Sequence, residues 1–173
     1  APGTLLTPGP LGGMLTLAKE VINGRVPILD INAHNQPVFY YLYGGWMKSF
    51  GFSIVSARSL SAIAMFVSGL ILIWWTRRFT RSWLVTAVVY LLYITSLTYF
   101  KTNIPVKPFA LSNLFTFASF ALLSGVYVKR GSFSFTVLFV AGLFLGLSMG
   151  VRLIFILPFT FAFWIFVAIL RQS

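Results

Sequence analysis

The sequence predicts an all-α polytopic membrane protein, in which two interfacial amphipathic helices are followed by about five transmembrane helices. Hydrophobic residues make up 58% of the 173 residues and charged residues only 9%, which is far less charge than a soluble domain carries. The sequence contains repeated apolar runs whose length approaches ~20 residues, which is the length of helix that crosses the hydrocarbon core. Short basic segments separate these runs.

The composition excludes several classes of function. The chain has no cysteine, which excludes disulfides and thiolate catalysis. One histidine and two acidic residues are too few for a metal site built from side chains alone, so we expect no protein-built metal site. The net charge of +11 comes from basic residues scattered between apolar runs. We therefore expect contacts with membrane lipids and no binding to nucleic acid.

The amino-terminal part predicts a first interfacial helix over Leu11–Asn23. Residues 1–10 are rich in Pro, Gly and Thr and lack the basic and apolar regions of a signal peptide, so we expect irregular structure there. The run that follows is too short and polar to span a membrane, and Asn23-Gly24 predicts its end. Its apolar residues lie near one face: Leu15, Leu17, Ala18, Val21 and Ile22.

A second interfacial helix is expected from about Pro37 to Phe50, after a loop over 25–36. Proline favours the first helical turn, and Gly51 is expected to end the helix. We interpret its aromatic residues as packing at the membrane–water interface, the alternative being a platform for stacking a sugar. These residues are Phe39, Tyr40, Tyr41, Tyr43 and Trp46.

The rest of the chain, residues 53–173, is predicted to form the transmembrane bundle, and residues 1–52 its outer-face loop. The expected spans are Ile54–Trp75, Trp83–Phe100, Val106–Val128, Phe133–Gly150 and Leu153–Leu170. In the fourth span, Gly142, Gly146 and Gly150 recur at every fourth position, which predicts close contact with another helix.

The basic residues predict which side of the membrane each segment faces. If the spans alternate, one side receives Arg77, Arg78, Arg81, Lys129, Arg130 and Arg171. Positive charge in short loops favours the cytoplasm, so residues 1–52 are expected on the outer side. An outer amino end leads us to expect that the chain is a fragment or a processed product.

Titratable groups concentrate between Gly24 and Arg58. Asp30 is one of two acidic residues, and as a loop carboxylate it either forms a turn or cap or acts as a general base on an acceptor hydroxyl. His34, the only histidine, is either a structural hydrogen-bonding residue or a second catalytic candidate.

Four basic residues near the outer ends of the expected spans are candidates for binding a phosphate-bearing lipid: Arg58, Lys101, Lys107 and Arg152. The alternative is that they extend into the headgroup layer and anchor the protein. Arginine pairs with phosphate through two parallel hydrogen bonds, and Arg58 and Arg152 have apolar sequence on both sides.

A series of short motifs resembles the first outer loop of bacterial GT-C membrane glycosyltransferases, in the branch of the protein mannosyltransferases and lipid A aminoarabinose transferases. The motifs are Gly24, VPILD (26–30), QPVFY (36–40), Phe50-Gly51 and ARSL (57–60), in that order. The later stretch GLFLGLSMGVRLIFIL (142–157) is similar to that family's later pair of spans with its arginine.

The resemblance implies transfer of a sugar, with inversion, from a polyprenyl-phosphate donor on the outer face of a bacterial inner (plasma) membrane. Residues 1–52 would then be periplasmic. Asp30 would act in acid–base catalysis or acceptor positioning, and the four basic residues would bind the lipid phosphate. No nucleotide-binding domain is needed, and the involvement of a divalent metal stays open.

A second hypothesis keeps the glycosyltransferase fold as a non-catalytic scaffold subunit of a larger complex. The family usually has an acidic residue just before the first interfacial helix, and Ala1–Gly13 contains none. Such a subunit would pack against other membrane subunits, lipids or pigments. A transporter or channel is disfavoured, because no expected span carries an acidic residue.

Overall fold

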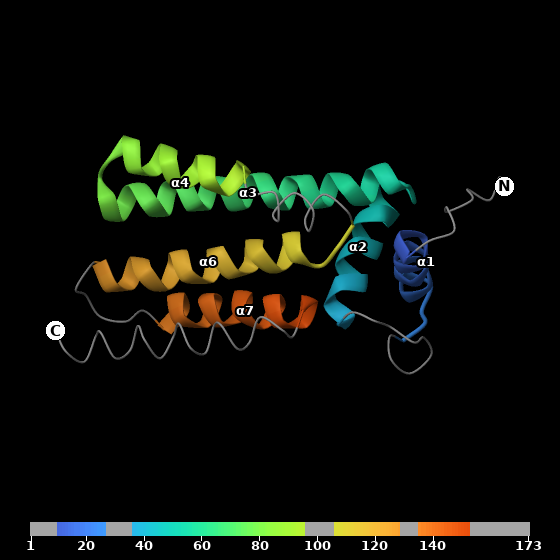
Figure 1. Ribbon diagram of the computed structural model, residues 1–173. Coiled ribbons are helices and arrows are strands. Elements are labelled where there is room, and N and C mark those ends of the chain that lie inside the picture. Colours follow the sequence, from blue (N-terminus) through green and yellow to red (C-terminus); the bar gives the residue numbers. More distant parts are fainter. Residues whose placement is uncertain (1–9, 27–35, 96–105, 129–134, 153–173) are drawn as a thin grey trace.

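The computed structural model describes residues 10–26, 36–95, 106–128 and 135–152, and their regular secondary structure is entirely helical (Figure 1). The helices are α1 (Pro10–Ile22), α2 (Pro37–Phe50), α3 (Ile54–Thr80), α4 (Trp83–Thr95), α6 (Phe109–Val128) and α7 (Phe135–Val151). The all-α class is therefore confirmed for the described residues. The fifth expected span, 153–170, lies outside them.

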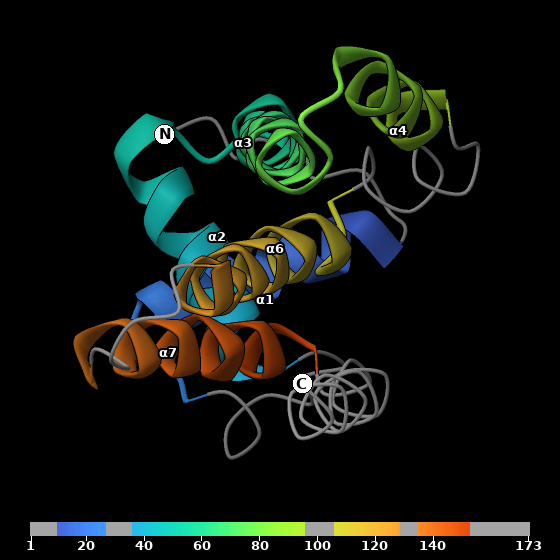
Figure 2. The same cartoon turned by 90° about the vertical axis from the view of Figure 1, so that its left-hand side faces the viewer.

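The helices form two antiparallel pairs that are crossed at one end by α2 and α1 (Figures 1 and 2). The pairs are α3 with α4 and α6 with α7, and α3 also packs along α6. Helix α2 contacts α1, α3 and α7. One end of the bundle therefore collects the start of α3, the start of α6 and the end of α7, whereas the turn between α3 and α4 lies at the other end.

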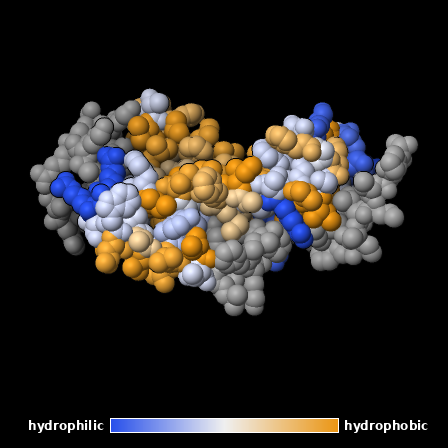
Figure 3. Space-filling model, turned by 90° about the horizontal axis from the view of Figure 1, so that it is seen from above, coloured by the Kyte–Doolittle hydropathy of each residue, from blue (hydrophilic) through white to orange (hydrophobic). Residues whose placement is uncertain are grey.

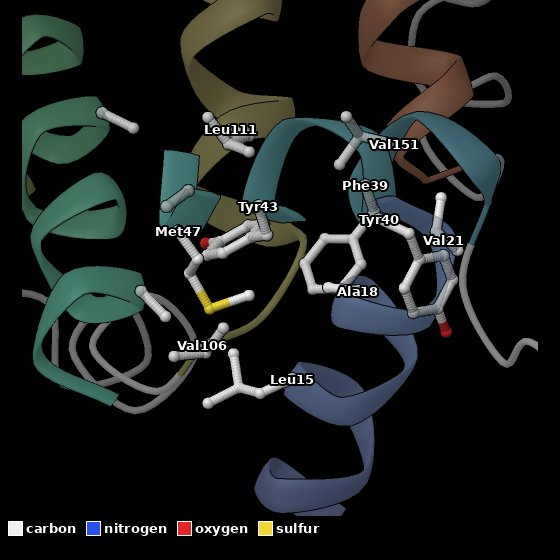
Figure 4. Packing of buried hydrophobic residues seen from close by; sticks show 13 residues of the cluster. Leu15, Ala18, Val21, Phe39, Tyr40, Tyr43, Met47, Val106, Leu111 and Val151 are labelled. Carbon is white, nitrogen blue, oxygen red and sulfur yellow. The ribbon is translucent and has the colours of Figure 1, made fainter. Parts of the chain in front are cut away.

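The predicted amphipathic character of α1 and α2 is confirmed. On α1, Leu15, Ala18 and Val21 are buried while Lys19 is exposed. They pack beneath an aromatic row on α2, as Figure 4 shows. The buried residues of α2 are Phe39, Tyr40, Tyr43, Gly44 and Met47. Burying each aromatic side chain contributes roughly 2–3 kcal/mol, so this contact holds the two helices across the bundle.

A close approach between α1 and α2 occurs at Gly44. A Cβ atom built there would contact the Ile22 side chain and would lie 2.6 Å from the backbone oxygen of Ala18. The next residue, Gly45, would meet nothing within 4 Å. Glycine is therefore required at position 44 and not at position 45.

Helix α3 is the one helix among the described residues that is long and apolar enough to cross a membrane. Only 22% of its most apolar stretch is buried inside the protein, whereas the core helix of a soluble protein is mostly buried. The helix continues past the predicted end at Trp75 to Thr80. Arginine is a good helix former and its charge favours a helix carboxyl end, so the basic run extends the helix instead of ending it. Arg81, with a φ of 53°, then closes it.

The third expected span begins later than predicted. Helix α6 starts at Phe109, and the N–H of Ser112 donates to the carbonyl oxygen of Pro108. Proline disfavours helical geometry at the residue before it, so Lys107 lies outside the helix. The described apolar parts of α4, α6 and α7 are each shorter than α3.

The three glycines of α7 differ in their surroundings. A Cβ at Gly150 would contact Val38 of α2, so the predicted close approach is confirmed at this residue. A Cβ at Gly142 or Gly146 would meet no atom of the described residues within 4 Å.

A seam of buried hydroxyl groups joins α6 to α7. Ser148 Oγ lies 2.8 Å from Ser112 Oγ and 3.0 Å from Thr116 Oγ1. The same hydroxyl is within hydrogen-bonding distance of the Ser112 carbonyl oxygen, at 3.0 Å. Ser119 Oγ donates to the carbonyl oxygen of Ala141 at 2.9 Å. Hydroxyl bonds of this kind fix the register of helices in apolar surroundings, and here they fix the carboxyl end of α7.

Candidate functional site

The candidate site is the end of the bundle at which α2 crosses α3, α6 and α7. A buried tyrosine joins three of its segments: Tyr43 Oη lies 2.7 Å from Ser61 Oγ of α3 and donates to the carbonyl oxygen of Lys107 at 3.4 Å. Burial raises the pKa of Tyr43 to about 12, and the hydrogen bond with Ser61 opposes part of this rise. The tyrosine is therefore a neutral tether between α2, α3 and the segment that leads into α6.

Trp46 makes a second link between α2 and α3. Its Nε1 donates to the carbonyl oxygen of Ser56 at 3.0 Å and to Ser59 Oγ at 3.2 Å. Ser53 caps the first turn of α3 by accepting from the N–H of Ser56. These contacts bracket Arg58, whose position on α3 is therefore fixed although its side chain is exposed.

Arg152 follows α7 directly and lies against α6. Its guanidinium carbon is 3.9 Å from the centre of the Phe109 ring, the first residue of α6. The backbone N–H of Arg152 donates to the carbonyl oxygen of Ser148, so the residue continues the end of α7 that the hydroxyl seam fixes, and the aromatic ring lies against its guanidinium. The side chain is half-buried, and a partly desolvated arginine attracts an anion more strongly than one in open water.

Three of the four predicted cations therefore come from segments that meet at one end. Arg58 is at the start of α3, Lys107 precedes α6 and Arg152 follows α7. Chain direction alone accounts for this, because α3 and α6 leave this end and α7 returns to it. The fourth predicted cation, Lys101, and the catalytic candidates Asp30 and His34 lie outside the described residues.

The acidic residue Glu20 does not offset these cations. Its Oε2 lies 3.0 Å from Nε of Arg25, in an ion pair between the last turn of α1 and the residues that follow the helix. No group of acidic or histidine side chains that could hold a metal ion occurs within the described ranges. The chemistry that this end supports is the binding of an anion by arginine and lysine.

Sequence reasoning missed the residues that hold the cations in place. These are Tyr43, Ser61, Phe109, Ser112, Thr116 and Ser148. A signal for the seam was present, because Ser112, Thr116 and Ser119 recur at helical spacing in an otherwise apolar run. The aromatic row of α2 is mainly packing, since Phe39 and Tyr40 are buried.

Over the described residues, the fold and the site define an all-helical protein with a helix long and apolar enough to cross a membrane and three cations on segments that share one end. No protein-family model, curated protein or solved structure matches the chain. The function is therefore inferred from the geometry of this end.

The tether predicts a pH dependence of stability. The pKa of Tyr43 is about 12 in the folded protein and about 10 when unfolded, so the unfolded chain loses this proton first. The contribution is fully present below pH ~10 and is lost as the pH rises through ~12, at about 1.4 kcal/mol per pH unit. Titration of tyrosinate absorbance is expected to show a late-titrating tyrosine that is missing from the Tyr43→Phe variant. A titration identical in the variant would contradict this assignment.

Proposed function

We propose that the chain is a GT-C-like membrane unit that transfers a sugar from a polyprenyl-phosphate donor to an acceptor on the outer membrane face. The observation that carries the proposal is the position of α1 and α2 across the bundle end that also holds Arg58, Lys107 and Arg152. An amphipathic pair at this place would lie in the headgroup layer. The cations beside it would then meet the phosphate of a lipid donor.

The proposal includes a bundle of five spans in a bacterial inner membrane, with α1 and α2 on the periplasmic side. Helices α3, α4, α6 and α7 would provide four spans and residues 153–170 the fifth. The surface pattern supports a bundle that crosses the membrane: hydrophilic residues gather towards the two ends of the molecule, with hydrophobic surface between them (Figure 3). The arginines of the α3–α4 turn would lie on the cytoplasmic side, because positive charge in a short loop favours that side.

In this reaction the acceptor hydroxyl attacks the anomeric carbon of the sugar while the bond from that carbon to the phosphate oxygen breaks. The hydroxyl proton passes to a carboxylate, for which Asp30 is the candidate. Negative charge develops on the departing polyprenyl phosphate. Arg152 is the best-positioned cation to stabilise it, because the guanidinium lies against the Phe109 ring and the hydroxyl seam fixes the end of α7 that precedes it.

The test is transfer of a labelled sugar from polyprenyl phosphate by the purified full chain. Asp30→Asn is expected to slow transfer by roughly 10²–10⁴-fold, the usual effect of removing a general base. Glu20→Gln is the matched control, because it neutralises a carboxylate that is already paired with Arg25. Equal transfer by Asp30→Asn and the wild type would remove Asp30 from the mechanism, and no transfer by the wild type would contradict the enzyme proposal.

A non-catalytic scaffold is the second candidate function, and the open face of α7 favours it. A Cβ at Gly142 or Gly146 would meet no atom of the described residues within 4 Å, and Phe139 beside them is 61% exposed. Small residues at this spacing let helices of a membrane complex approach closely. Native mass spectrometry distinguishes the two candidates: an active monomer supports the enzyme, and an inactive chain recovered only with other subunits supports the scaffold.

A further inference from the structure

The end opposite α1 and α2 carries a second group of cations, at the turn from α3 to α4. We call it the arginine corner, and it consists of Arg77, Arg78 and Arg81 together with Trp74 and Trp83. It forms part of the hydrophilic surface at the left of Figure 3. The proposed transfer reaction uses none of these residues.

Two arginine side chains of the corner, those of Arg77 and Arg78, are held by neighbouring groups. The guanidinium carbon of Arg77 is 4.2 Å from the centre of the Trp83 ring, and its Nη1 donates to the carbonyl oxygen of Arg81 at 2.6 Å. The guanidinium carbon of Arg78 is 5.4 Å from the centre of the Trp74 ring. These two arginines lose little further conformational freedom when they bind a ligand.

No carboxylate balances these charges within the described part of the chain. Its one acidic residue, Glu20, is in α1 at the other end and pairs with Arg25. Two buried N–H groups also lack an acceptor among the described residues, Arg78 Nε and Trp75 Nε1. Buried donors are normally satisfied, so these two N–H groups are exceptions within the described residues. The three guanidinium groups of the corner supply both the charge and the hydrogen-bond donors for an anion with several oxygen atoms.

The surface next to the corner is apolar. On α4, Leu84 is 74% exposed. Further exposed apolar residues lie on both helices, namely Val88, Leu91 and Leu92 on α4, and Phe66 and Leu70 on the neighbouring α3. A ligand that combines an anionic head with long apolar chains fits both the cations and these helix faces.

We propose that the arginine corner binds the headgroup of an anionic phospholipid, whose acyl chains lie along the exposed faces of α3 and α4. The phosphate oxygens accept from the guanidinium groups, and the indoles of Trp74 and Trp83 lie at the level of the headgroups. A free phosphate ion would use the cations but not the apolar faces. The site is independent of the proposed sugar transfer, since it lies at the other end of the bundle.

The test measures lipid preference with the full chain reconstituted in phosphatidylcholine vesicles. Phosphatidylglycerol with brominated acyl chains is added in steps, and quenching of tryptophan fluorescence gives its binding relative to phosphatidylcholine. The wild type is expected to prefer phosphatidylglycerol. Arg77→Gln/Arg78→Gln/Arg81→Gln is expected to weaken that binding by about 100-fold, because each basic side chain near an anionic surface contributes ~1 kcal/mol.

Two further variants separate a built site from diffuse charge. Arg77→Lys/Arg78→Lys/Arg81→Lys keeps the charge but loses paired hydrogen bonds, and it should bind several-fold more weakly than the wild type. Arg78→Gln should weaken binding more than its charge-matched control Lys48→Gln, on exposed α2 surface. These two comparisons distinguish a built lipid site from diffuse positive charge even if the triple glutamine variant fails to fold.

Three results would overturn the proposal. They are a wild type with no preference for phosphatidylglycerol, a lysine variant that binds as tightly as the wild type, and equal binding by Arg78→Gln and Lys48→Gln. Inorganic phosphate is the remaining probe. It is expected to leave the quenching unchanged, and displacement of the lipid by millimolar phosphate would assign the corner to a free anion instead.

Discussion

Gly44→Ala is expected to displace α1 from α2. The added Cβ would lie 2.6 Å from the backbone oxygen of Ala18, and a backbone atom cannot move without moving its helix. Overpacking of this kind costs about 1–3 kcal/mol, which outweighs the ~1 kcal/mol that alanine gains over glycine within a helix. Thermal unfolding followed by circular dichroism should show a lower midpoint. Amide hydrogen exchange in α1 should be faster than in the wild type under conditions in which exchange in α6 and α7 is unchanged.

Gly45→Ala is the matched control for this variant. It makes the same chemical change one residue later in the same helix, at a position where a Cβ meets nothing within 4 Å. We expect unchanged or slightly higher stability, because alanine favours the helix. Equal destabilisation by both substitutions would contradict the packing of α1 against this face of α2.

Arg152→Gln is expected to lower sugar transfer by about 10²–10³-fold, the usual effect of removing a donor that stabilises charge in the transition state. The reason is the placement of its guanidinium, which is half-buried and 3.9 Å from the Phe109 ring. Arg152→Lys should recover part of the rate, since it keeps the charge without paired hydrogen bonds. The measurement is the initial rate of transfer at a saturating concentration of donor.

Arg25→Gln is the charge-matched control for Arg152→Gln. Arg25 is exposed, pairs with Glu20 and lies outside the candidate site. Its variant should transfer sugar at the wild-type rate. If Arg152→Gln does the same, the cation at the end of α7 has no part in stabilising the leaving phosphate.

Local rules predicted the helices α1 and α2. Pro37 at the start of α2 and Gly51 after it mark the helix ends in the sequence itself. The apolar spacing of α1 likewise identified its buried face, which includes Leu15 and Ala18. Both signals depend on neighbours within a few residues, so no knowledge of tertiary structure was needed.

The long-range contacts could not be read from the sequence in the same way. Phe109 and Arg152 are far apart in the chain and meet only because α6 and α7 pack antiparallel in a particular register. The link between Tyr43 and Ser61 depends in the same way on the angle at which α2 crosses α3. The predicted spans identified which cations share an end, whereas the groups that hold them emerged only from the packing.

The most direct test of the proposed donor site is photocrosslinking with a polyprenyl phosphate that carries a photoreactive group beside the phosphate. Crosslinked peptides of the full chain are mapped by mass spectrometry, with excess unlabelled polyprenyl phosphate as competitor. We predict competable crosslinks at the start of α3, the start of α6 and the end of α7, around Arg58, Lys107 and Arg152. Crosslinks confined to the arginine corner, or unaffected by the competitor, would contradict a donor site beside α1 and α2.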